Sequence, residues 1–212
     1  MRHRVWVLPS VCLLVWLLAV PAAAGRLHRV SDKDEALLRA GVIQASDVPS
    51  GWMPDRPRGP DPNQYGGHPA CKALNNAVDR PRRKVPNASS SFFDPNSGDP
   101  TTTASDTVYA FTSVSAATKY LAAFQKKSAP ACLYQSTHVA ATPIPGLQGV
   151  GDDNAGYERT LPIPGLTAVS DILDVRVGRA VVEFTFQNVG AGIPPGPDIV
   201  NVVIGRVKRV QS

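Results

Sequence analysis

The chain has 212 residues, with 22 Lys and Arg against 17 Asp and Glu, and a formal net charge of +5 at pH 7. Residues 25–212 contain 20 of the basic and all 17 of the acidic residues, a net charge of +3 that is far below the excess typical of nucleic-acid-binding domains. Composition therefore argues against a nucleic-acid partner. The chain contains 17 glycines and 20 prolines, so long loops are expected.

The N-terminal segment has the order of a secretory signal peptide. A basic start precedes an uncharged apolar run at residues 5–20, and small residues ending at Ala24 provide an A-x-A cleavage site. We therefore expect residues 1–24 to be removed and Gly25 to become the N-terminus of a protein that is secreted or held in the cell envelope.

This segment has two other interpretations. An uncleaved membrane anchor stays open as an alternative, although the run is shorter than the roughly 20 residues of a spanning helix and Pro9 interrupts it. A lipoprotein is disfavoured because Cys12 stands at the front of the apolar run, whereas a lipid-modified cysteine stands at the cleavage end.

The remaining cysteines fit an exported protein. After loss of the signal peptide, Cys71 and Cys132 form an even pair in an oxidising compartment, which predicts a disulfide worth roughly 4 kcal/mol. His68 and His138 lie near these cysteines and give the residue types of a zinc site. The disulfide is the favoured interpretation, because the close Cys-x2-4-Cys spacing of zinc sites is missing.

The first elements of the exported part are a helix and a long loop. Ser31 is a capping residue for a helix that Gly41 ends, and a turn then leads to Trp52. The density of proline and glycine predicts a loop at residues 54–69. A short helix at about 69–78 follows, and residues 79–86 are expected to return to loop.

The middle of the chain predicts two strands and a helix. "ASSSFF" at 88–93 and "TVYAFTS" at 107–113 have the composition of strands, separated by turn residues. The apolar residues of 116–127 follow the spacing of a core-facing helix stripe. Pro130 is expected to end this helix and to leave Cys132 in an extended segment.

The last third contains the strongest strand signal. "AGYERT" at 155–160 predicts a strand, and residues 170–186 predict a hairpin with its turn at Gly178-Arg179. That turn would pair Val175 with Val182, and Leu173 with Phe184, on one face of the sheet. Apolar residues at helical spacing in 198–210 favour a final helix. A strand is the alternative there, because so many of the residues are β-branched.

No catalytic, metal-binding or cofactor-binding motif is present in the sequence. There is no G-x-S-x-G, and the histidines of the exported part fall in segments expected to be loop or extended chain. A hydrolytic triad stays open, because triads are assembled in space. The acidic pair Asp152-Asp153 has the residue types of an acid/base pair, but adjacent acids in "VGDDNAG" more commonly form a solvated turn.

A local excess of positive charge occurs at Arg80, Arg82, Arg83 and Lys84. A solvated loop accounts for it most simply. The functional alternative is attraction to anionic lipid or to an anionic polymer of the envelope, worth about 1 kcal/mol for each charge near such a surface.

Several segments together resemble a known family. "LLRAGVIQASDVPSGW", Cys71, "VYAFTSVSAATKYLAAF", Cys132, "GVGDDNAGY" and "VRVGRAVVEF" follow in the order expected of the PknH-like extracellular sensor domains of actinobacteria. The resemblance covers most of residues 35–210, and it rests on the order and spacing of motifs that are individually weak.

This resemblance implies an α+β fold in which helices pack against a twisted, mainly antiparallel sheet. The length of residues 25–212 predicts a single domain. The chain departs from the kinase of this family in having one disulfide where the kinase's sensor domain has two, and in lacking the kinase and its transmembrane helix.

The resemblance also implies a cleft that binds an unidentified small ligand, and it brings no catalytic residues and no cofactor. The function expected is that of a secreted, non-enzymatic sensor-like module at the cell envelope. The alternatives are a secreted hydrolase acting on lipid or cell-wall substrates, or an envelope interaction protein that uses the basic loop.

Four side chains are candidates for the ligand cleft. Tyr65 lies on the Pro/Gly-rich loop, and Tyr157 and Arg159 alternate on a strand beside the "GDD" turn. We expect these three to line one cleft with Trp52 at its wall, since binding sites combine rigid aromatic area with a few polar groups. Burial of Trp52 in the core is the competing interpretation.

Overall fold

The computed structural model describes residues 30–57, 68–97, 102–144, 149–163, 166–189 and 196–212. The predicted signal peptide, with its cleavage site at Ala24 and Gly25, lies outside the described residues. So do Tyr65 and most of the predicted loop at 54–69.

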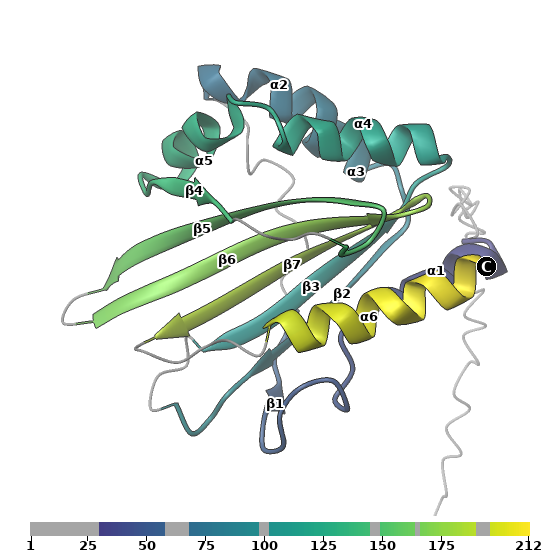
Figure 1. The fold of residues 1–212 in the computed structure, drawn as a ribbon, viewed down its shortest axis with the longest axis horizontal. Coiled ribbons are helices and arrows are strands. Elements are labelled where there is room, and N and C mark those ends of the chain that lie inside the picture. The colour runs from purple at the N-terminus through teal and green to yellow at the C-terminus, as the bar shows by residue number, and fades with distance from the viewer. Residues whose placement is uncertain (1–29, 58–67, 98–101, 145–148, 164–165, 190–195) are drawn as a thin grey trace, which may run out of the picture.

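The fold is α+β and is built on one seven-stranded antiparallel sheet with the order β1-β2-β3-β7-β6-β5-β4 (Figure 1). This confirms the expected fold class. The strands are β1 (Met53–Pro54), β2 (Asn87–Phe93), β3 (Thr103–Ala110), β4 (Ala141–Pro143), β5 (Asp153–Ile163), β6 (Leu166–Val177) and β7 (Ala180–Val189).

The β6–β7 hairpin at the centre of the sheet has the predicted register. Val175 pairs with Val182, and Leu173 with Phe184. Its two-residue turn is possible because Gly178 adopts a positive φ of 52°, which costs little in a residue without a Cβ. The Gly178 N–H donates to the Asp152 carboxylate at 2.6 Å, so the acidic turn "GDD" fixes the hairpin end.

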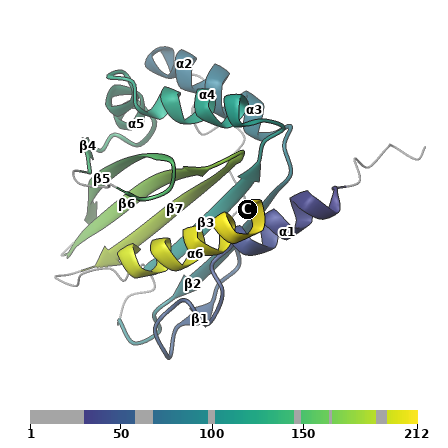
Figure 2. The ribbon, with the colours of Figure 1, turned by 45° about the vertical axis from the view of Figure 1, so that its right-hand side comes forward.

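Helices cover both faces of the sheet (Figures 1 and 2). One face carries α1 (Asp32–Gly41) and α6 (Gly196–Gln211), and α6 confirms the expected final helix. The other face carries the helical layer, defined as η1 (Pro69–Cys71), α2 (Lys72–Leu74), η2 (Asn75–Asp79), α3 (Arg80–Arg82), α4 (Val114–Phe124) and α5 (Ala129–Thr137). None of the helices in the described parts of the chain has the length and hydropathy needed to cross a membrane.

Alternation along the strands gives the sheet two separate cores. On β7, Val182 and Phe184 point toward α1 and α6, whereas Val181 and Glu183 point toward the helical layer. The first core, under α1 and α6, includes Leu37, Leu38, Ile43, Val108, Leu173, Val175, Phe184, Phe186, Ile199, Val203 and Val207. The second core, under the helical layer, includes Cys71, Leu74, Val78, Tyr109, Phe111, Tyr120, Phe124, Cys132, Leu133, Tyr157 and Val181.

Arg206 of α6 ties the two helices of the first face together. Its guanidinium donates to the carbonyls of Ala40 and Val42 at 3.1 and 2.7 Å, and it pairs with Asp47 at 2.7 Å. The carbonyls at a helix end have no partner inside the helix, so Arg206 satisfies groups that would otherwise be left without a partner at the end of α1.

Two predicted boundaries in the helical layer are wrong, and both errors involve proline. The predicted loop at 79–86 begins as helix, since η2 and α3 continue through Arg82. Cys132, expected in an extended segment, lies on α5. Pro130 stands in the first turn of α5, where a missing N–H costs nothing, so it begins a helix instead of ending one. Pro81 follows the π-helical turn η2, and the helix continues past it to Arg82.

The predicted disulfide joins Cys71 of η1 to Cys132 of α5, and both residues are fully buried. With both sulfurs in this bond, neither is a thiolate ligand for the zinc site considered from the sequence. The bond closes a loop with a sequence separation of 61 residues and fixes α5 against the first turn of the helical layer.

Reduction of this bond should destabilise the domain. We expect the Cys71→Ala/Cys132→Ala variant to lose about 4 kcal/mol of unfolding free energy, because the unfolded chain regains the entropy of the open loop. Urea denaturation measures this. Reductant should lower the wild type to the same value and leave the variant unchanged; a loss under about 1 kcal/mol would contradict a stabilising bond.

Asp106 is the buried carboxylate of the first core. The Ile43 N–H donates to its Oδ1 at 3.2 Å and the Ser90 hydroxyl donates to the same oxygen, while Oδ2 has no hydrogen-bond partner among the described residues. Burial raises the pKa of Asp106 to about 7, against the opposing effects of these hydrogen bonds and of the Arg206 charge.

Stability should therefore fall as Asp106 loses its proton. Its folded-state pKa exceeds the unfolded value, so the contribution is complete below about pH 4 and is lost as pH rises through about 7. Asp106→Asn removes this titration. Between pH 4 and pH 8, we expect the variant to gain up to about 4 kcal/mol relative to the wild type, measured by urea denaturation. The exposed Asp198→Asn is the control, and an equal pH response in both variants would refute this.

Candidate functional site

A pocket of about 520 Å³ opens where the end of α4 and the start of α5 meet the sheet edge formed by β4 and β5. Pockets of this size are typical of small-molecule sites. Its lining combines apolar residues, among them Pro130, Pro143 and Ile144, with a small number of polar side chains. We call it the edge pocket.

Tyr157 connects the edge pocket to the second core. It lies on β5 with 6% of its surface exposed, and its hydroxyl donates to the carbonyl of Phe124 at the end of α4. Burial, and next the charge of Asp174, raise the pKa of Tyr157, so the phenol stays a donor. The bond connects the C-terminal end of α4 to β5 beside the pocket.

The mouth of the edge pocket has a positive balance of charge. Lys126 and Lys127 are exposed and belong to the lining, together with one carboxylate, Asp153. Gln125 bridges from α4 to β5, donating to Asp153 Oδ1 at 2.8 Å and to the Asn154 carbonyl at 3.2 Å. Two ammonium groups beside one engaged carboxylate favour a ligand with an anionic group.

Beneath the helical layer lies a buried ionic cluster. Arg82 of α3 is 1% exposed; its Nη2 lies 2.7 Å from Asp79 Oδ1, and its Nη1 lies 3.8 Å from Glu183 Oε2 on β7. Asp174 of β6 is also buried and stands directly opposite Glu183 in the hairpin register. Among these four groups, one guanidinium faces three carboxyl groups.

The imbalance in this ionic cluster favours protonated carboxyl groups. Burial, followed by the charge of Glu183, raises the pKa of Asp174, and burial also raises the pKa of Glu183 while Arg82 opposes both shifts. Burial alone would lower the pKa of Arg82, but the charge of Glu183 and the other acidic groups keep it above its usual value. Arg82 is therefore a fixed cation, and the carboxyl groups are the part of the cluster that can hold a proton.

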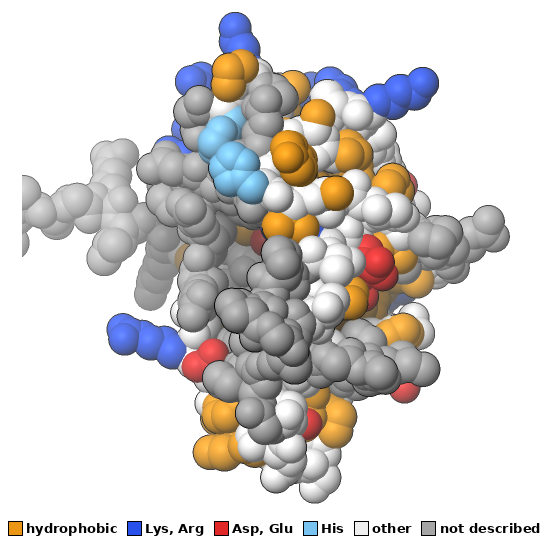
Figure 3. All heavy atoms as spheres, turned by 90° about the vertical axis from the view of Figure 1, so that its left-hand side faces the viewer, with side chains coloured by type: hydrophobic (Ala, Val, Ile, Leu, Met, Phe, Trp, Pro, Cys, Tyr) orange, Lys and Arg blue, Asp and Glu red, His pale blue; other side chains and the backbone are white. Residues whose placement is uncertain are grey.

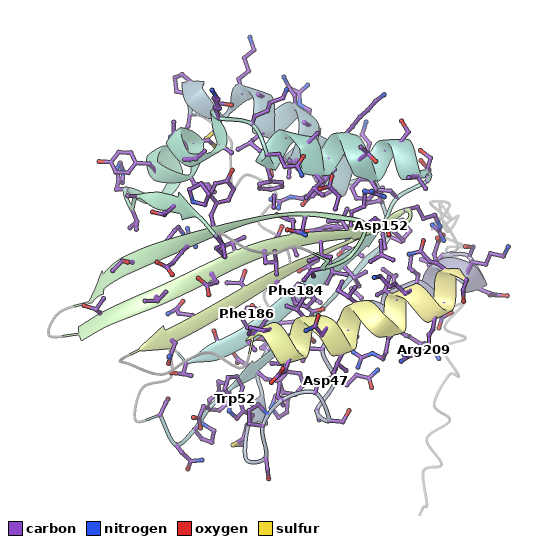
Figure 4. The ribbon with its side chains drawn as sticks, viewed as in Figure 1. Asp47, Trp52, Asp152, Phe184, Phe186 and Arg209 are labelled. Atoms are coloured by element: carbon purple, nitrogen blue, oxygen red, sulfur yellow. A yellow bond between two sulfur atoms is a disulfide. The ribbon has the colours of Figure 1, made fainter. Side chains whose placement is uncertain are left out.

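Of the four residues expected to form one cleft, Tyr65 lies outside the described residues, and Trp52 lies apart from Tyr157 and Arg159. Tyr157 lines the edge pocket, and Arg159 points to the same side of β5, opposite Ala141 and Ser170, without joining the lining. Trp52 packs against the first core beside β1 (Figure 4). The prediction that Trp52 walls the cleft of Tyr157 is wrong, because they lie on opposite faces and five strand spacings, roughly 24 Å, separate β1 from β5.

The basic loop also differs from its prediction. Arg80, Arg83 and Lys84 are exposed as expected, but Arg82 is buried and neutralises Asp79 one helical turn away. Arg82 therefore does not belong to the surface charge. The sequence contained a signal for this role. The predicted pairing of Val175 with Val182 places Asp174 opposite Glu183 at the next position. Two carboxyl groups facing each other need a nearby cation, which Arg82 provides.

Comparison with known proteins gives few matches. No family model matches the chain, and no match was found among curated proteins. Among solved structures, the chain has a distant structural similarity to the extracellular domain of PknH from Mycobacterium tuberculosis. The similarity covers 86% of this chain and 99% of that domain, at 11% identity and a TM-score of 0.45.

The ionic cluster should depend on Arg82. We expect Arg82→Met to lower the free energy of unfolding at pH 7 by about 3–5 kcal/mol, because it leaves buried carboxylates without a cation. The nearby Lys84→Met removes an exposed charge and should change stability by less than about 0.5 kcal/mol. Urea denaturation of both variants checks this, and equal effects would show that Arg82 is not the balancing charge.

Proposed function

We propose that this protein is a secreted, non-enzymatic ligand-binding module of the cell envelope, and that the edge pocket binds a small molecule with an anionic group. The observation that carries this proposal is the pocket itself, which has a volume of about 520 Å³ and a lining that combines apolar residues with one buried tyrosine and two exposed lysines. Apolar area with a few placed polar groups is the composition of small-molecule sites.

The chemistry of the lining supports binding over catalysis. Within the described residues, the lining includes no serine, cysteine or histidine, which are the residue types of the common acyl-transfer triads. The phenol of Tyr157 is engaged with a helix carbonyl, and Asp153 is engaged by Gln125. These groups orient a ligand more readily than they exchange protons with one.

Export is supported by two independent features. The N-terminal segment has the order of a signal peptide, and the buried disulfide belongs to oxidising compartments. Both features support a ligand drawn from the molecules of the envelope or the medium.

A secreted hydrolase is the weaker candidate. The observation in its favour is the pair Asp174 and Glu183, two neighbouring carboxyl groups whose pKa values burial raises. Asp174 is 1% exposed and neither residue lines the edge pocket, so a substrate bound there would not touch them. The ionic cluster is better explained as the support of the helical layer.

Binding can be tested with glycerol 3-phosphate, with glycerol as its neutral match. By isothermal titration calorimetry, we expect the phosphate ester to bind and glycerol not to. Lys126→Gln/Lys127→Gln should weaken binding at least about fivefold, since each charge-assisted contact contributes about 1 kcal/mol or more.

The control variant is Lys33→Gln/Lys208→Gln, which removes the same charge from exposed positions on α1 and α6. It should bind like the wild type. Equal binding by both double variants, or equal binding of glycerol and its phosphate, would contradict an anionic ligand in the edge pocket.

A further inference from the structure

The outer surface of the helical layer carries charge of one sign. Residues 68–86 and 113–138, which form the layer and its adjoining turns, contain eight Lys and Arg and a single acidic residue, Asp79. Asp79 is buried against Arg82. The other seven cationic side chains are exposed.

Helical geometry directs these charges outward. Along α2, η2 and α3, the residues Leu74, Val78 and Arg82 are four apart and buried. Lys72 and Arg80 are exposed, and Lys84 follows in the exposed turn.

The same arrangement holds at α4. Its buried stripe includes Tyr120 and Phe124, and Lys119 is exposed on the other side of the helix, with Lys126 and Lys127 just beyond its end. Figure 3 shows Lys and Arg side chains at the top of the molecule, where the helical layer lies. We call this surface the cationic face.

The rest of the protein has the opposite balance. Outside residues 68–86 and 113–138, the exported part holds 12 basic and 16 acidic residues, so a face with a net charge of +7 belongs to a molecule whose remainder carries −4. Such a separation of charge orients a protein in the field of an anionic surface, with the cationic face toward it.

Apolar side chains are exposed on the same layer. Val114 at the start of α4 and Tyr134 on α5 are each 52% exposed. Tyrosine is enriched at the boundary of lipid bilayers, where its ring reaches apolar material and its hydroxyl stays wet. A polysaccharide chain offers no apolar layer to these side chains, whereas a bilayer does.

We propose that the cationic face binds the anionic headgroups of a lipid bilayer, so that the protein lies on a membrane surface with its helical layer against the lipid. Each basic residue near such a surface contributes about 1 kcal/mol, and the seven together are enough for reversible peripheral binding. The cationic face and the edge pocket share only Lys126 and Lys127. The variants tested below leave both lysines unchanged.

The test is co-sedimentation with vesicles of phosphatidylcholine alone or containing 30% phosphatidylglycerol. The wild type and all variants are expressed as the full chain and purified after export, so they share one N-terminus. We expect binding only to the anionic vesicles, and loss of binding at high salt because the charges are screened.

Lys72→Glu/Arg80→Glu/Lys84→Glu should bind anionic vesicles about 100-fold more weakly. The matched control, Lys33→Glu/Lys208→Glu/Arg209→Glu, makes the same change in net charge on α1 and α6 and should stay within about threefold of the wild type. Equal losses in the two triple variants would overturn the proposal, because they would show a response to net charge alone.

Tyr134→Ser separates a bilayer from a soluble polymer. It should weaken binding to anionic vesicles several-fold and leave binding to polyglutamate unchanged, since only the bilayer accepts the ring. Binding to polyglutamate without binding to anionic vesicles would overturn the proposal in favour of an envelope polymer. Binding of glycerol 3-phosphate by the Lys72→Glu/Arg80→Glu/Lys84→Glu variant shows that the edge pocket is intact, so the two proposals fail separately.

Discussion

The arrangement of the helical layer depends on the buried guanidinium of Arg82. The tight hairpin that builds the centre of the sheet also places Asp174 opposite Glu183 on the face that the layer covers. Two carboxyl groups there repel when ionised, and Arg82 is the cation that reaches into this region, accompanied by its own partner Asp79. The segment around Arg82 is therefore drawn onto the sheet, and its other basic side chains are left facing outward.

Elements whose signals are local could be predicted from the sequence. Ser31 accepts from the Asp34 N–H at 3.1 Å as an N-cap should, and the Gly178-Arg179 turn sets the register of the hairpin by itself. The helical layer was harder to predict, because Pro130 was expected to end a helix and residues 79–86 were expected to be loop. Whether a proline ends a helix or begins the next depends on the packing of the residues after it, and after Pro130 this is the buried Cys132.

The candidate site was predictable only in part, because it is made by contacts between distant segments. Tyr157 could be chosen from its place on a strand beside an acidic turn, but its partner, the carbonyl of Phe124, comes from a helix end 33 residues earlier. Trp52 was misplaced because sequence alone does not say which strands separate two segments. Lys126 and Lys127 line the edge pocket because the end of α4 lies near β5. No local sequence pattern predicts that contact.

The margins of the sheet are its shortest strands. β1 has two residues and ends in Pro54, and β4 has three and ends in Pro143. A second chain can extend a sheet only by pairing with a continuous row of free N–H and C=O groups, and a short edge ending in a residue without an N–H offers no such row. The two outermost strands are thereby poor templates for pairing with a second chain. This property would suit the secreted role proposed above, because no chaperone driven by ATP acts outside the cell.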